Sequence, residues 1–151
     1  MKKILLLSLA CFALFGCGDN KVTKEYLVGK WNCVYKEYGS KYDSKLKRYI
    51  DYFETDSKQV IQSYEIVNGI LLLKNENNKA IEFDLDLLYN NLNMETITNM
   101  CGKWSYNQNL SKNTSNKFTY EWEEFCEAYI KRGDLPPYPK TKRVEVCTRI
   151  K

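Results

Sequence analysis

The chain has no histidine among its 151 residues. Histidine is the commonest general base in enzymes and the commonest protein ligand for metals. Its absence excludes the serine and cysteine catalytic triads that use an imidazole, and most zinc sites. The six cysteines also lack a Cys-x-x-Cys pair, the spacing that would favour a thiolate metal site. We therefore expect a protein that is not an enzyme and that binds no metal and no cofactor.

A large surplus of charge of one sign is also lacking. Lys and Arg number 23 and Asp and Glu 19, which gives a net charge of +4. Without Lys2 and Lys3 at the start of the chain, 21 basic and 19 acidic residues remain, a net charge of +2. A nearly neutral domain has no electrostatic reason to bind nucleic acid, so no nucleic-acid partner is expected.

The chain has no apolar run long enough to span a bilayer as a helix. Ile4–Phe15 is apolar except for Ser8 and covers 12 residues, whereas a membrane-spanning helix needs about 20. After Lys2 and Lys3, such a run is typical of the hydrophobic part of a secretory signal peptide. We therefore expect an exported protein.

The end of this run resembles the lipobox of bacterial lipoproteins. Leu14-Phe15-Gly16-Cys17 has an aliphatic residue three positions before the cysteine and a small residue directly before it. Phe15 departs from the pattern, because a small or β-branched residue is usual there. The resemblance implies cleavage after Gly16, a diacylglycerol on the Cys17 thiol and an acyl chain, such as palmitate, on the new amine. The alternative is an ordinary signal peptide that ends near a cysteine.

Lipidation of Cys17 would decide where the protein resides. Each buried methylene contributes about 0.8 kcal/mol, so three acyl chains would anchor the chain durably to a membrane. In bacterial lipoproteins an aspartate directly after the cysteine tends to retain the protein at the inner membrane; here Gly18 has that place. We therefore favour the periplasmic face of the outer membrane, and the inner membrane is the alternative. The expected organisation is a signal peptide over 1–16, a lipidated tether over 17–25 and one folded domain over 26–151.

Four further cysteines remain after cleavage if Cys17 is lipidated. An even number in an exported domain predicts two disulfides, and four cysteines allow three pairings. We favour Cys33–Cys147, which would join the opening strand to the closing one, and Cys101–Cys126, which spans a modest loop.

Aromatic residues and alternating patterns predict a mainly β fold. Tyr is abundant at 12 residues, with 3 Trp and 6 Phe, and aromatic residues favour strands. Asn68-Gly69 suits a type I′ hairpin turn, and Asn90-Asn91 is a second expected turn. Alternation predicts strands over Tyr26–Tyr35, Lys47–Phe53, Gln59–Val67, Ile70–Leu73, Ile81–Leu87, Leu92–Ile97, Lys103–Tyr106 and Arg143–Ile150.

The region before the last strand is ambiguous. Asn107–Asn116 is polar and predicts a loop. Over Thr119–Lys131 the apolar residues fit a helix face without interruption, acidic residues come first, and Gly133 follows at a place that suits a C-terminal cap. We therefore expect a helix there. The predicted fold is an antiparallel meander of seven to eight strands with one helix before the last strand.

The first strand contains Gly29-Lys30-Trp31, which resembles the Gly-x-Trp of the lipocalin-like, or calycin, group. The resemblance implies a small barrel whose closed end is plugged by Trp31, with an arginine from the last part of the barrel stacked over the ring. Arg149 is the favoured partner, and Arg143 is the alternative. An open β-sandwich is the competing architecture.

Paired carboxylates are the remaining candidates for catalysis. Asp84 with Asp86, and Glu121 with Glu124, have a spacing at which two acids could serve glycoside chemistry. The first pair shares the polar face of a predicted strand, and the second lies on the solvent face of the predicted helix. We therefore expect both pairs to meet water, and no catalytic residue is assigned.

These observations predict a membrane-anchored bacterial envelope lipoprotein that is not an enzyme. Its partners would be the membrane, through the N-terminal lipid, and either a small apolar ligand or an envelope protein. The alternative function is a periplasmic protein inhibitor, for instance of lysozyme, or an immunity or exclusion lipoprotein. A deep apolar cavity would favour the small ligand, whereas a filled barrel would favour protein binding.

Overall fold

The computed structural model describes residues 20–75, 79–91, 93–98, 102–126 and 140–151. Eight strands form one antiparallel sheet in the order β6-β5-β4-β1-β10-β9-β8-β7, and β2 pairs with β3 in a separate ribbon. The elements are α1 (Lys24–Leu27), β1 (Gly29–Ser40), β2 (Tyr42–Asp43), β3 (Arg48–Tyr49), β4 (Phe53–Val67), β5 (Ile70–Lys74), β6 (Ala80–Glu82), α2 (Leu85–Asn90), β7 (Asn93–Thr98), β8 (Gly102–Thr114), β9 (Lys117–Cys126) and β10 (Lys140–Arg149). No helix in the described ranges is long and apolar enough to cross a membrane.

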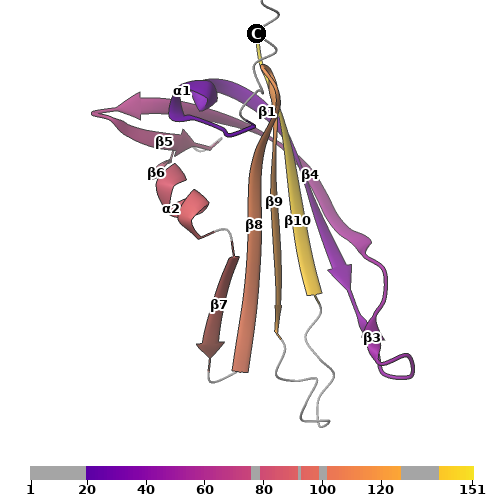
Figure 1. The fold of residues 1–151 in the computed structure, drawn as a ribbon. Helices are drawn as coiled ribbons and strands as arrows, with labels where there is room; N and C mark the ends of the chain where they lie inside the picture. Colours follow the sequence, from indigo (N-terminus) through magenta and orange to yellow (C-terminus); the bar gives the residue numbers. More distant parts are fainter. Residues whose placement is uncertain (1–19, 76–78, 92, 99–101, 127–139) are drawn as a thin grey trace, which may run out of the picture.

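The sheet is a curled half-barrel, as Figure 1 shows. Its first and last long strands, β1 and β10, pair side by side in the middle of the sheet, as the first and last strands of an up-and-down barrel do. The edges of the sheet are β6 and β7, and α2 lies in the connection between them. The predicted mainly β, antiparallel meander with a barrel-like shape is confirmed.

The Asn68-Gly69 turn is confirmed in its backbone geometry. Asn68 and Gly69 both have positive φ, 52° and 81°, as a type I′ turn requires. The turn joins β4 to β5, with Val67 opposite Ile70.

The helix predicted over Thr119–Lys131 is wrong for its first eight residues, which lie in β9; the rest falls outside the described residues. Most of the loop predicted over Asn107–Asn116 is likewise strand, in β8. The period-2 pattern prevails because β9 pairs along its length with both β8 and β10. The acidic residues that indicated a helix start lie next to lysines of β10 instead: Glu121 contacts Lys142 and Glu123 contacts Lys140.

The strand predicted over Ile81–Leu87 is also wrong in its second half. Asp84 caps α2, because its carboxylate accepts a hydrogen bond from the Leu87 backbone N–H at 2.9 Å. Leu85 and Leu88, three positions apart, then both become buried. The expected turn at Asn90-Asn91 is the end of this helix, where the Asn91 N–H donates to the Leu87 carbonyl.

Contacts of the folded domain begin earlier than the predicted boundary at Tyr26. The Asn20 carbonyl accepts a hydrogen bond from the Lys112 N–H at 2.8 Å. Val22 is 1% exposed and belongs to the core. Part of the expected tether is therefore structural, and the folded domain includes residues from Asn20 onwards.

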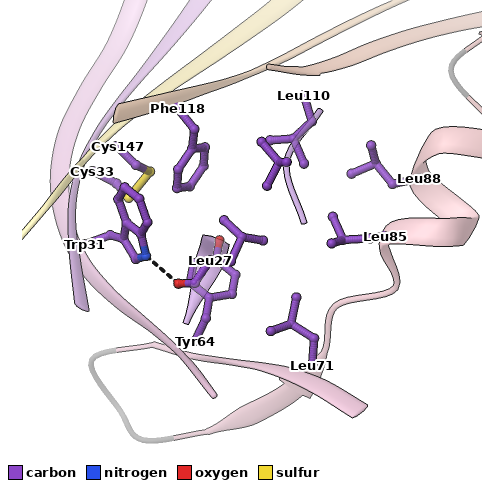
Figure 2. Close-up of a cluster of buried hydrophobic side chains, with 11 residues drawn as sticks. Leu27, Trp31, Cys33, Tyr64, Leu71, Leu85, Leu88, Leu110, Phe118 and Cys147 are labelled. Atoms are coloured by element: carbon purple, nitrogen blue, oxygen red, sulfur yellow. Dashed lines mark hydrogen bonds between the residues drawn. A yellow bond between two sulfur atoms is a disulfide. The ribbon is translucent and has the colours of Figure 1, made fainter. Parts of the chain in front are cut away.

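The core fills the end of the half-barrel where α1 and α2 lie (Figures 1 and 2). Trp31 is completely buried, and its indole N–H donates to the Leu27 carbonyl at 2.6 Å. The Trp31 and Phe118 rings meet edge to face, with their centroids 4.8 Å apart. The other buried hydrophobic residues of this cluster are Val22, Leu27, Cys33, Tyr64, Leu71, Leu85, Leu88, Leu110 and Cys147. This end of the half-barrel is thus packed with side chains.

Candidate binding site on the concave face

The predicted disulfide between Cys33 and Cys147 is present in the structure. The two residues lie opposite each other on β1 and β10, and both are completely buried. Cys126 is disulfide-bonded as well, and Cys101, the partner predicted for it, lies outside the described residues. Cys17 lies outside them too.

The structure brings Trp31 and Arg149 together. The Arg149 guanidinium carbon is 4.2 Å from the centre of the Trp31 ring, a cation–π distance. The same guanidinium donates to the backbone carbonyls of Val28, at 2.7 Å, and Tyr26. Gly29 allows this approach, because its φ is +125° and a Cβ there would lie 2.8 Å from Arg149 Nη1.

We call the sheet face that carries Trp31, Cys33 and Phe118 the concave face. Every second residue of a strand lies on the same face, so this face extends along the strands beyond the core. On β1 these residues are Tyr35 and Glu37, and their cross-strand partners on β10 are Glu145 and Arg143. The next partners, on β9, are Tyr120 and Trp122. The open half of the half-barrel is therefore lined by aromatic and charged side chains, whereas the other half is filled by the core.

Arg143, the alternative partner for Trp31, occupies this open half. Its guanidinium lies 4.2 Å from the centre of the Trp122 ring and donates from Nε to Glu37 at 2.7 Å. The Tyr35 hydroxyl donates to the same Glu37 oxygen at 3.1 Å. The hydrogen bond from Arg143 lowers the pKa of Glu37, and burial raises the pKa of Tyr35 to about 12.

Glu145 lies between Tyr35 on one side and Tyr120 on the other. Its carboxylate accepts a hydrogen bond from the Gln62 side-chain amide at 2.5 Å. The Gln62 carbonyl oxygen in turn accepts from the Tyr64 hydroxyl at 3.1 Å. This relay fixes the orientation of the carboxylate, and burial raises its pKa.

Two adjoining cavities share Tyr35 and Glu145. The larger has a volume of about 430 Å³ and is also lined by Lys58, Val60, Ile61, Gln62 and Asn75. The smaller, of about 160 Å³, is also lined by Tyr120, Trp122 and Arg143. Glu145 is therefore the charged group common to both.

A Glu145 oxygen also lies within 4.8 Å of the sulfur atoms of Cys33 and Cys147. These sulfurs are bonded to each other, whereas a metal ligand must be a free thiolate. The three residues therefore do not make a metal site while the disulfide is intact.

The acidic pairs considered in the sequence do not converge. Asp84 caps α2 and is exposed, and Asp86 is exposed in the first turn of the same helix. Glu121 and Glu124 lie on opposite faces of β9, because they are an odd number of positions apart. Glu124 shares the alternation of Tyr120 and Trp122, so it lies on the concave face with Glu37 and Glu145, whereas Glu121 lies on the other face.

These residues leave a signal in the sequence. In β10, Arg143 and Glu145 share the alternation of Cys147, whereas Val144 and Val146 occupy the intervening positions. A strand that places charges on the face of its disulfide cysteine, and valines on the other face, indicates a polar site inside the curl.

No protein-family model and no curated protein matches this chain. Among solved structures it is similar to EF1p2_mFAP2b bound to DFHBI, at 7% identity over 83% of this chain and 95% of that one, with a TM-score of 0.33. A multidomain protein including DUF1735 from Bacteroides ovatus is similar over 79% of this chain and 47% of that one, at 13% identity and a TM-score of 0.15. Both TM-scores are too low to support a shared fold.

Proposed function

We propose that this chain is a membrane-anchored bacterial envelope lipoprotein, not an enzyme, that binds a small ligand or a segment of an envelope protein on its concave face. The observation that carries the proposal is the pair of cavities around Glu145 and Tyr35. Binding sites typically combine aromatic walls with a few fixed polar groups, and the open half of the curl has both.

The lining favours a ligand with polar groups over the purely apolar one expected from the sequence. Lys58, Gln62 and Glu145 line the larger cavity. The large apolar side chains, Trp31 and Phe118 among them, are packed into the core at the other end. Transfer of a wholly apolar ligand to the open half would desolvate charged groups without replacing their hydrogen bonds.

The anchor would hold this domain close to the bilayer. If Cys17 carries the lipid, Gly18 and Asp19 alone separate it from Asn20, whose carbonyl accepts a hydrogen bond from Lys112 of the fold. Three residue steps extend at most about 11 Å. We place the protein at the periplasmic face of the outer membrane, because Gly18 rather than an aspartate follows the cysteine.

Photocrosslinking in intact cells tests the binding role. A photoreactive phenylalanine analogue at Tyr120 would face the smaller cavity, whereas the same analogue at Thr119 would face the opposite side of β9. We expect a covalent mass increase on the peptide that contains position 120 and none at position 119. Equal labelling of both positions, or labelling of position 119 alone, would contradict binding on the concave face.

A further inference from the structure

Glu145 is a half-buried carboxylate with few hydrogen-bond partners. Within the described residues its one hydrogen-bond donor is Gln62, and it forms no ion pair. Glu37 lies on β1, two positions after Tyr35, which is opposite Glu145. In contrast to Glu145, it accepts hydrogen bonds from both Arg143 and Tyr35. The charge of Lys58 acts on Glu145, but the two side chains form no ion pair within the described residues. A partly desolvated carboxylate that lacks an ion pair is held at a cost in stability.

The hydroxyl groups beside Glu145 are committed elsewhere. Tyr35 donates to Glu37 at 3.1 Å, and Tyr120 donates to the Gln108 side-chain oxygen at 2.9 Å. The two tyrosines therefore present rings rather than donors to the Glu145 carboxylate. Trp122 adds a third ring to the smaller cavity.

From this geometry we infer that Glu145 is the anchor of a binding site for a small ligand that carries an ammonium group. The ammonium would donate to the carboxylate oxygen that Gln62 leaves free, and the rings of Tyr35, Tyr120 and Trp122 would stabilise its charge. Arg143 does not oppose this cation strongly, because Glu37 neutralises it. This inference rests on the proposed binding function and adds the class of ligand.

Lys58 defines the other end of the ligand. Its ammonium lies 4.9 Å from the centre of the Tyr35 ring, at the larger cavity that it lines together with Glu145. Its side chain is exposed and forms no ion pair within the described ranges. A hydrogen-bond acceptor or carboxylate on the ligand would meet Lys58 while the ammonium meets Glu145.

Three small probes separate these features. The full-length protein, purified in a neutral detergent, is titrated with 6-aminohexanoate, n-butylammonium and hexanoate, and binding is followed by tryptophan fluorescence and calorimetry. We expect 6-aminohexanoate to bind most tightly, n-butylammonium more weakly and hexanoate least. Glu145→Gln should weaken both ammonium probes at least about tenfold. Lys58→Gln should weaken 6-aminohexanoate alone.

Glu121→Gln is the matched control, because Glu121 lies on β9 outside both cavities. Its affinity for the ammonium probes should equal that of the wild type, and thermal unfolding verifies that each variant is folded. Three results would overturn the proposal that the ligand carries an ammonium group. These are hexanoate binding as tightly as n-butylammonium, no binding of either ammonium probe, and unchanged affinity for the ammonium probes in a folded Glu145→Gln variant. Crosslinking at position 120 in cells reports on the concave face independently, so a positive crosslink with negative probes would reject the ligand class alone.

Discussion

The Arg149 guanidinium closes the packed end of the half-barrel by covering the Trp31 ring at 4.2 Å while donating to the carbonyls of Val28 and Tyr26. One side chain thus ties the segment before β1 to the end of β10. A planar guanidinium is suited to this geometry, because it stacks on a ring and donates in its own plane at the same time.

Replacement of Arg149 should therefore destabilise the fold. We expect Arg149→Lys to lower the free energy of unfolding by about 2 kcal/mol, because an ammonium cannot stack and bridge both carbonyls. Urea unfolding measures the change. Arg48→Lys, at an exposed position of β3, is the control and should leave the midpoint unchanged. Equal midpoints for the two variants would show that the Trp31–Arg149 contact is not stabilising.

Glu145 should reduce stability at neutral pH. Burial raises its pKa above the ordinary value of 4.5, so the folded state holds its proton more strongly than the unfolded state. The contribution of Glu145 to stability is therefore most favourable below the ordinary pKa. It is lost as the pH rises through the raised pKa of the folded state. Glu145→Gln removes this loss and should unfold a few degrees higher than the wild type near pH 7.

The difference between Glu145→Gln and the wild type should disappear near pH 4, where the wild-type carboxyl is protonated in the folded state. Thermal unfolding followed by circular dichroism at both pH values measures it. If Glu145→Gln melted at a lower temperature than the wild type near pH 7, the Glu145 carboxylate would be stabilising, and this prediction would be wrong.

Asp84 should act as a helix cap. Asp84→Ala removes the acceptor for the Leu87 N–H, and we expect a loss of about 1 kcal/mol in the free energy of unfolding. Asp86→Ala, in the first turn of the same helix and exposed, should cost less. Chemical unfolding of the two variants compares them, and a larger loss for Asp86→Ala would contradict the capping role.

Cys17 should be the point of membrane attachment. We expect Cys17→Ser to abolish palmitate labelling and to release the protein from the membrane fraction, because the acyl chains provide the anchor. Metabolic labelling and fractionation of cells measure both effects. Cys11→Ser, within the expected signal peptide, is the control and should label as the wild type does. Membrane partition that is unchanged in Cys17→Ser would reject lipidation.

Local signals predicted the parts of the fold that depend on neighbouring residues. Asn68-Gly69 was predictable because its positive φ angles are a property of two residues and their turn. The Cys33–Cys147 pair followed from placing one cysteine on the opening strand and one on the closing strand. Thr119–Cys126 was mispredicted because the charge order of a helix start is also the charge order that β9 needs beside Lys140 and Lys142.

The amino-acid sequence by itself determined several of the alternating strands and the Asn68-Gly69 hairpin, because these depend on periodicity and short-range backbone preference. The pair Trp31 and Arg149 was instead an implication of the Gly-x-Trp resemblance. Tertiary structure alone decided that Glu145 lies half-buried between two tyrosines and that Arg143 is neutralised by Glu37. The physical reason is that burial and charge pairing are set by the strands on either side. Strand pairing places β10 between β1 and β9, and its Cys147 meets Cys33 of β1 across 114 positions of the chain.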